Sequence, residues 1–204
     1  MITVVDYQMG NVGSIVNMLK RLGFEVRLSS VLAEIMQADK LILPGVGSFD
    51  TGMANLDRLG LREPLEQKRA SGTPVLGICL GMQLLFEGSE EGDRPGLGWL
   101  RGHCIRFRFE ERDTRLKIPH MGWNDVRPVQ RESLFREMAE DAGYYFVHSY
   151  HAVCTDPADV LGFTTHGYEF ASAVQRANVS GTQFHPEKSH KHGKRLLKSF
   201  AESA

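Results

Sequence analysis

The tightest constraint on this chain is a cysteine placed between two glycines at the end of a short apolar run. Residues 73–78 (TPVLGI) predict a buried strand of a parallel sheet, and residues 82–86 (MQLLF) predict a helix. Cys79 therefore lies at a sharp turn between strand and helix. Gly77 and Gly81 permit such a backbone, and the arrangement is that of a nucleophile elbow.

A cysteine in such a turn suggests nucleophilic catalysis by a thiolate. The N-terminus of the following helix favours the charged form of Cys79, and the backbone N–H of Leu80 is placed to receive a developing oxyanion. A lone buried cysteine is more often a small apolar core residue, so the turn by itself does not decide the role.

A candidate base lies far downstream, in residues 183–189 (QFHPEKS). In an extended segment, His185 and Glu187 project to the same side because one residue separates them. The carboxylate can then hold one imidazole nitrogen while the other nitrogen faces the sulfur. A lone histidine beside a proline is usually a loop residue. Combined with the glycine-flanked cysteine, however, the spacing predicts a catalytic triad of Cys79, His185 and Glu187.

Apolar runs alternate with amphipathic stretches in the first half of the chain. This alternation predicts an α/β fold with a central, mostly parallel sheet and helices on both faces. In such sheets the site lies beyond the carboxyl ends of the strands, where Cys79 falls. The predicted strands are residues 2–5, 24–28, 40–43 and 75–78, and the predicted helix that ends at Gly23 has an apolar face of Val12, Ile15, Val16, Leu19 and Leu22.

From Trp99 onward the pattern changes to short runs separated by turn residues. We interpret this half as a mixed or antiparallel extension of the same sheet, because no linker of disordered composition separates the halves. Residues 1–204 are therefore expected to form a single domain. The predicted elements of this half are strands at 104–109, 123–126, 144–147, 160–164 and 171–175 and a closing helix at 191–202.

Two further segments carry candidate binding groups. The loop 44–49 (PGVGSF) follows a predicted strand, and its glycines are either simple turn chemistry or allow a peptide to rotate. In the second case, amides near Val46 and Gly47 complete an oxyanion hole. Gln83 lies one helical turn beyond Cys79, where its amide could meet an amide substrate; the alternative interpretation is a solvated helix residue.

Composition argues against several classes of function. Lys and Arg number 24 and Asp and Glu 25, so the net charge of -1 provides no general attraction to nucleic acid. The three cysteines and eight histidines lack the spacing of a zinc site, and no metal or cofactor is expected. The N-terminus does not resemble a signal peptide and no apolar run could span a membrane, so we expect a cytoplasmic protein without membrane contact.

Residues 77–83 (GICLGMQ) and 184–187 (FHPE) resemble the class I, or triad, glutamine amidotransferases, which hydrolyse glutamine to glutamate and ammonia. The resemblance runs along nearly the whole chain. Within that family the finer motifs are most similar to those of the glutaminase subunits of imidazole glycerol phosphate synthases, which act in histidine biosynthesis. These motifs are DYQMGN (6–11), PGVGSF (44–49), PHMGWN (119–124), YFVHSY (145–150) and HPEKS (185–189).

The resemblance implies a flavodoxin-like class I glutamine amidotransferase fold and L-glutamine as the substrate. It assigns the loop with Val46 and Gly47 to the oxyanion hole and implies that this loop can rest in a non-productive orientation. It also favours Glu91 over the adjacent Glu90 as the carboxylate that receives the substrate ammonium. The stretch implied to present backbone groups to the amino-acid end of glutamine is Ser149, Tyr150 and His151.

Ammonia released at neutral pH is mostly protonated and unreactive, so a partner that receives it through a tunnel is chemically expected. By resemblance, this partner is a (β/α)8-barrel cyclase subunit that makes imidazole glycerol phosphate and an aminoimidazole carboxamide ribotide, and the two form a heterodimer. Trp123 is a candidate anchor in that interface. The positions that match the family's interface or gating residues are Asn11, Pro119, Met121, Trp123, Tyr145 and Lys188.

Three alternative functions stay open. The chain could serve another synthase that aminates a nucleotide, chorismate or a sugar, although Met82, where several such relatives have histidine, argues against it. It could be a peptidase or γ-glutamyl hydrolase on the same fold. It could also be a catalytically silent partner that senses glutamine, which the intact triad argues against.

One position departs from the family pattern. Gln8 stands where the family usually has a glycine. The departure concerns the backbone of the first strand-to-helix turn and affects no catalytic group.

Overall fold

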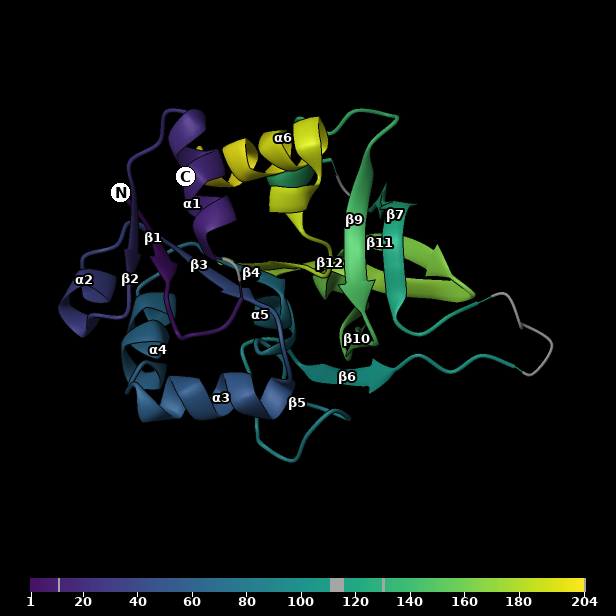
Figure 1. Ribbon diagram of the computed structural model, residues 1–204, viewed down its shortest axis with the longest axis horizontal. Helices are drawn as coiled ribbons and strands as arrows, with labels where there is room; N and C mark the ends of the chain where they lie inside the picture. Colours follow the sequence, from purple (N-terminus) through teal and green to yellow (C-terminus); the bar gives the residue numbers. More distant parts are fainter. Residues whose placement is uncertain (11, 111–115, 130, 204) are drawn as a thin grey trace.

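The computed structural model describes residues 1–10, 12–110, 116–129 and 131–203 (Figure 1). The predicted α/β fold with a mostly parallel central sheet is confirmed. Five parallel strands lie in the order β2-β1-β3-β4-β13, which is the flavodoxin-like order with β13 as the fifth strand. They are β1 (Ile2–Val5), β2 (Val26–Ser29), β3 (Lys40–Gly45), β4 (Val75–Cys79) and β13 (Val179–Thr182).

The second half of the chain extends this sheet from β13, as predicted. Antiparallel pairing joins β13 to β12, β12 to β10 and β10 to β6, and β5 adds in parallel to β6. Strand β11 pairs with both β12 and β8. These strands are β5 (Gly88–Ser89), β6 (Gly102–Arg106), β8 (Arg127–Pro128), β10 (Tyr150–Cys154), β11 (Val160–His166) and β12 (Tyr168–Arg176).

Strands β7 (His120–Asp125) and β9 (Gly143–His148) were expected in the same sheet, and this expectation is wrong. They form a separate two-stranded antiparallel sheet, from which Tyr145 also makes an isolated bridge to His185, and Figure 1 shows them running across the direction of β12. Burial alternates along both strands, so this ribbon packs one face on the core and leaves side chains such as Met121 and Trp123 outside. Alternation of this kind specifies a two-faced strand but not the sheet in which it pairs.

Helices cover both faces of the main sheet (Figure 1). On one face α1 and α6 pack through a shared apolar cluster that includes Ile15, Leu19 and Leu196. Within the described ranges, none of the helices combines the length and apolar character needed to cross a membrane. The helices are α1 (Val12–Arg21), α2 (Leu32–Met36), α3 (Phe49–Arg58), α4 (Arg62–Ala70), α5 (Leu80–Gln83) and α6 (His190–Ala201), with 3-10 turns η1 (Ser133–Phe135), η2 (Pro157–Asp159) and η3 (Pro186–Lys188).

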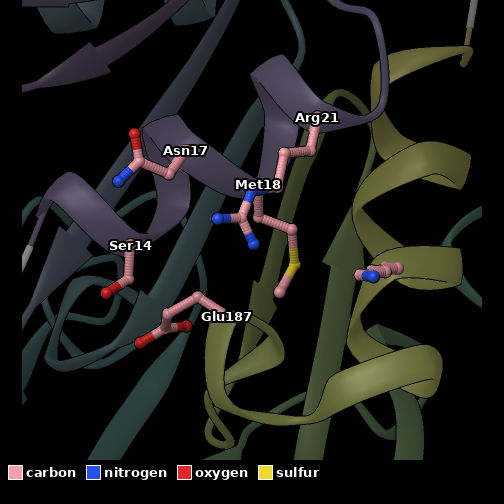
Figure 2. Close-up of a pocket in the computed structure, with 6 residues that line it drawn as sticks. Ser14, Asn17, Met18, Arg21 and Glu187 are labelled. Atoms are coloured by element: carbon pink, nitrogen blue, oxygen red, sulfur yellow. The ribbon is translucent and has the colours of Figure 1, made fainter.

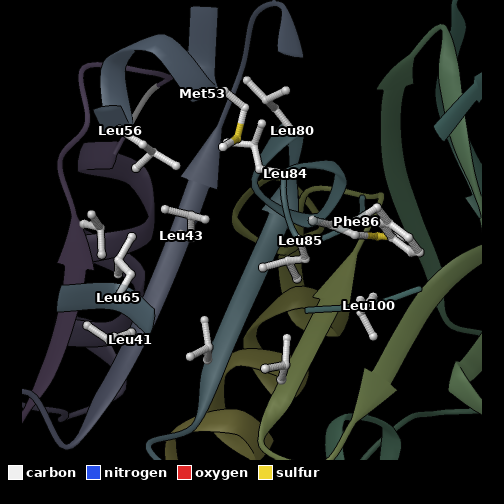
Figure 3. Close-up of a cluster of buried hydrophobic side chains, with 14 of the residues drawn as sticks. Leu41, Leu43, Met53, Leu56, Leu65, Leu80, Leu84, Leu85, Phe86 and Leu100 are labelled. Carbon is white, nitrogen blue, oxygen red and sulfur yellow. The ribbon is translucent and has the colours of Figure 1, made fainter. Parts of the chain in front are cut away.

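The opposite face of the sheet is sealed by leucine-rich packing (Figure 3). Leu43 of β3, Leu56 of α3 and Leu65 of α4 are all buried in this cluster. Full burial of one such side chain stabilises the fold by about 2 kcal/mol.

The predicted helix at 82–86 is wrong in length, because α5 ends at Gln83. Residues 84–86 continue as hydrogen-bonded turns and insert three fully buried side chains into this core.

The turn between β1 and α1 accommodates Gln8 in a left-handed conformation with φ of 64°. A glycine adopts this φ without strain, whereas a side chain costs roughly 1 kcal/mol. Two contacts hold the residue there. The Gln8 N–H donates to Asp6 Oδ1 at 3.0 Å, and Gln8 Oε1 accepts from Arg58 Nη2 at 2.6 Å.

Candidate active site

Cys79 lies at the end of β4 in a backbone conformation that few non-glycine residues adopt, with φ of 54° and ψ of -112°. Its conformation is imposed by close packing of the turn. A Cβ added to Gly81 would overlap the carbonyl oxygen of Leu43 on the neighbouring strand. Conformations of this kind cost about 1–3 kcal/mol and cluster at functional sites. Since α5 is a single turn, its dipole is a smaller influence on Cys79 than the sequence pattern implied.

The carboxyl ends of three adjacent strands bring the separated motifs together. Gly45 on β3 pairs with Cys79 on β4, and Thr182 on β13 pairs with Ile78. The oxyanion-loop candidates therefore lie on one side of Cys79 and the His185 segment on the other. This juxtaposition depends on the sheet register and not on proximity along the chain.

His185 and Glu187 form a buried hydrogen-bonded pair. His185 Nδ1 lies 2.7 Å from Glu187 Oε1, and the side chains are 1% and 6% exposed. The prediction that the segment is extended is wrong, because residues 186–188 form the 3-10 turn η3. Pro186 has the φ that suits the first turn of a helix, and this tight turn brings the carboxylate back beneath the imidazole.

The electrostatics of His185 favour its protonated form. Burial opposes the charge, but the side chains of Cys79 and Glu187 outweigh it and raise the pKa of His185 to about 10. The Nε2 atom is buried and makes no hydrogen bond to any described residue. In this conformation, therefore, the sulfur raises the pKa of the imidazole although no hydrogen bond of regular geometry joins the two side chains.

A cavity of about 250 Å³ opens over Cys79. It gathers the predicted oxyanion and substrate groups from β3, α5, the segment after β5 and the β9–β10 connection. The residues that line it are Val46, Gly47, Cys79, Leu80, Gln83, Glu91, Pro119, Val147, His148, Ser149 and Tyr150.

Gln83 is buried, so the interpretation of a solvated helix residue is wrong. Its Nε2 donates to the carbonyl of Tyr150 at 3.1 Å and to Gln183 Oε1 at 3.0 Å. Both N–H groups of the amide are therefore committed within the protein. The Gln83 oxygen is the polar atom left to face a ligand.

The structure distinguishes Glu91 from Glu90, which the local sequence could not do. Glu90 is exposed and accepts from Arg108 Nη2 at 2.8 Å. Glu91 lines the cavity and accepts from the Phe49 N–H at 2.9 Å. Burial and the nearby Asp50 raise the pKa of Glu91, and an incoming ammonium group would offset that cost.

His151 does not reach the cavity with its side chain. Its ring is buried, with Nε2 2.9 Å from the hydroxyl of Tyr168. His148 was not predicted as a site residue, and its side chain lines the cavity. The two residues differ in their place in the strands. His148 is the last residue of β9, whereas His151 lies inside β10.

His148 belongs to a chain of neutral polar groups beneath the cavity. Its Nδ1 donates to the Tyr150 carbonyl at 2.7 Å, so its Nε2 accepts from His120 Nδ1 at 3.0 Å. Asn124 Nδ2 in turn donates to His120 Nε2 at 3.1 Å. Burial lowers the pKa of His120 to about 4 and holds that of His148 well below its ordinary value. The ring nitrogens of His120 and His148 all have hydrogen-bond partners only while both imidazoles stay neutral.

We expect acid to destabilise the protein through this pair. The unfolded chain takes up protons near pH 6.5 while folded His120 resists them to about pH 4, so its contribution is complete above pH 6.5 and is lost as the pH falls between these values. The loss is on the order of 3 kcal/mol. Urea unfolding at pH 7.5 and 4.5 should show a smaller pH effect in His120→Asn than in the wild type. Equal pH effects would contradict the assignment.

The predicted interface residues lie together around the β7–β9 ribbon. Met121 and Trp123 are 63% and 52% exposed, and the Trp123 ring stacks on His190 with centroids 5.4 Å apart. Lys188 Nζ lies over the ring of Tyr145 at 5.6 Å. Pro119 is exposed at the edge of the cavity, and Asn11 lies outside the described residues.

Glu187 also lines a second cavity of about 250 Å³ (Figure 2). Ser14, Asn17, Met18 and Arg21 line it from one face of α1, and Lys194 closes it from α6. It does not include Cys79, so the chemistry assigns the candidate active site to the first cavity. In the described ranges no group of three or more His, Cys, Asp or Glu side chains is arranged to hold a metal ion.

The family description "Glutamine amidotransferase class-I" matches residues 3–204, and the chain belongs to this family. Curated relatives with high identity to this chain have one specific name within that family. The chain is 50% identical over 203 residues to imidazole glycerol phosphate synthase subunit HisH 2 of Pseudomonas aeruginosa, covering 99% of each chain. It is 47% identical over 205 residues to the protein of the same name from Methanococcus maripaludis, covering 100% of both.

Solved structures show the same fold at low sequence identity. A crystal structure of a glutamine amidotransferase matches with a TM-score of 0.77 at 20% identity and covers 98% of this chain and 97% of that one. The structure of PurLQS from Thermotoga maritima matches with a TM-score of 0.72 at 20% identity, covering 98% and 96%. At this identity the two matches concern the fold alone.

Proposed function

We propose that this chain is the glutaminase subunit of an imidazole glycerol phosphate synthase. It hydrolyses L-glutamine and supplies ammonia to a cyclase subunit in histidine biosynthesis. The observation that carries the hydrolysis is Cys79, held in a strained turn at the base of a cavity with the buried pair of His185 and Glu187 beside it. The full-length identity to HisH subunits supports the pathway, and it favours this synthase over one that aminates a nucleotide, chorismate or a sugar.

The residues divide the reaction into two steps. The Cys79 sulfur attacks the side-chain amide carbon of glutamine, and His185 gives a proton to the nitrogen that leaves as ammonia. His185 then takes a proton from water, which attacks the thioester and releases glutamate. Glu187 holds Nδ1 of the imidazole throughout, so that Nε2 serves the reacting atoms.

The proposed oxyanion hole combines the N–H of Leu80 with an amide from the Val46–Gly47 loop. Gly47 has φ of 128°, a conformation that strains any residue with a side chain. The same loop lines the cavity over Cys79. Rotation of one peptide here would change the number of donors without moving the triad.

The remaining cavity groups bind the amino-acid end of glutamine. Glu91 receives the ammonium group, the Gln83 oxygen accepts from a substrate N–H, and the backbone of residues 149–151 completes the contacts. No cofactor or metal takes part.

The product ammonia leaves toward the β7–β9 ribbon, where Met121, Trp123, Tyr145 and Lys188 meet a (β/α)8-barrel cyclase in a cytoplasmic heterodimer. Residues 1–204 act as a single glutaminase domain, with Asn11 and Pro119 at the same interface.

We expect the isolated chain to hydrolyse glutamine slowly and to be accelerated about a hundredfold by its ligand-bound cyclase partner, the size of effect of one oxyanion donor. The motivation is the glycine-bearing loop at Gly47, which can rest with its amide turned away. The measurement is glutamate release by the lone chain and by the chain saturated with partner. Full activity of the lone chain would contradict the switch, and no glutamate release in either state would contradict the glutaminase assignment.

A further inference from the structure

A buried glutamine that the mechanism above does not use lies against the nucleophile. Gln183 follows β13, is 0% exposed, and places its Nε2 3.8 Å from Cys79 Sγ. We propose that Gln183 is a catalytic hydrogen-bond donor that stabilises the thiolate of Cys79. The inference rests on the proposed function, because it concerns the same sulfur.

The surrounding hydrogen bonds determine which end of the Gln183 amide faces the sulfur. The Tyr150 carbonyl can only accept, so Gln83 must turn its nitrogen toward it. The second N–H of that nitrogen then points at the Gln183 side chain, 3.0 Å away, and requires an oxygen there. With Oε1 used in this way, Gln183 presents its nitrogen to Cys79.

The orientation of the Gln183 amide also depends on the hydrogen-bonded histidines His148 and His120. The Tyr150 carbonyl that holds Gln83 also accepts from His148 Nδ1 at 2.7 Å. Because that oxygen can only accept, a flip of the Gln83 amide would set two acceptors against each other. The amide of Gln183 is therefore held in one orientation before any substrate arrives.

A thiol and a thiolate need different neighbours. As a thiol, Cys79 donates to the Val147 carbonyl at 3.9 Å. After ionisation the sulfur can only accept, and that carbonyl then repels it. Among the described residues, the amide of Gln183 is a donor already aimed at the sulfur. Hydrogen bonds to an ionised partner are about twice as strong as neutral ones, so the contact favours the thiolate over the thiol.

Two substitutions separate donation to the sulfur from support of Gln83. Gln183→Glu keeps an oxygen for Gln83 but presents a second oxygen to the sulfur, whereas Gln183→Met removes both groups at similar volume. Gln175→Met makes the same chemical change on β12, away from the cavity, and serves as the matched control. Circular dichroism and thermal unfolding of all three establish folding.

The test measures alkylation of Cys79 by iodoacetamide as a function of pH in the free chain. We expect the pH of half-maximal reaction to rise by about one unit or more in both Gln183 variants and to be unchanged in Gln175→Met, one unit being a tenfold change in the ionisation equilibrium. Cys104 and Cys154 are a small background, because burial raises the pKa of both thiols, and the Cys79→Ala chain measures it. In the partner-saturated enzyme, glutaminase turnover at pH 7 should fall 10- to 100-fold, the size of a lost hydrogen bond to a charged group.

Two outcomes would overturn the inference. If Gln183→Glu reacts with the wild-type pH dependence, the residue only supports Gln83. If Gln183→Met does so, the amide plays no part. Gln183→Met is the deciding variant, because the carboxylate of Gln183→Glu also opposes ionisation of the sulfur through its charge. Alkylation requires neither glutamine nor a partner, so failure of this inference is distinguishable from failure of the glutaminase assignment.

Discussion

Replacing Cys79 with alanine should reduce glutamine-dependent synthesis by at least about 10⁴-fold, because the substitution removes the nucleophile. The change deletes one buried sulfur. Cysteine already has a Cβ at this positive φ, so alanine adds no strain, and the fold and partner binding should persist. The measurement is glutamate release by the chain saturated with its cyclase partner. Cys79→Ser should be similarly inactive, since a hydroxyl is a far weaker nucleophile in a site arranged for a thiolate.

A second substrate provides the control for this variant. The complex that contains Cys79→Ala should still make product from added ammonium salt, because the acceptor chemistry belongs to the partner. Loss of ammonium-dependent activity would point to a broken complex and not to a lost nucleophile. Glutamate release at the wild-type rate would exclude the thiolate mechanism.

His185→Ala should approach the defect of Cys79→Ala, whereas Glu187→Gln should retain roughly 10- to 100-fold more activity than His185→Ala. The imidazole carries the proton in both steps. The Glu187 carboxylate, by contrast, orients the ring through one bond of 2.7 Å and stabilises its charge, which an amide can do in part. Single-turnover rates of glutamate formation measure the difference without interference from product release.

The Glu187→Gln variant also has a specific pH signature. The carboxylate is one of the groups that raise the pKa of His185 to about 10, so its neutralisation should lower the pH at which the imidazole loses its proton. The alkaline limb of the single-turnover profile should therefore move to lower pH. Negligible rate effects at both positions would remove this pair from the mechanism.

Local sequence determined the elements and the chemical types at the site. The alternation of apolar runs and amphipathic stretches predicts the ends of β1, β3, β4 and α1 to within two residues, because side-chain burial follows the period of the backbone. The glycines on either side of Cys79 predict its tight turn for a similar reason, since few residues fit there. The family resemblance supplied Glu91 and the interface positions, which the spacing of residues alone did not distinguish.

Tertiary structure decided the features that depend on pairing between distant segments. The register of β13 with β4 places Gln183 beside Cys79 although 104 residues separate them, and no periodicity contains that information. The same holds for the separate β7–β9 ribbon, for the side chain of His148 at the cavity, and for the η3 turn that brings Glu187 beneath His185. A local pattern specifies which face of an element is buried, whereas its partner across the sheet is chosen by the packing of the whole chain.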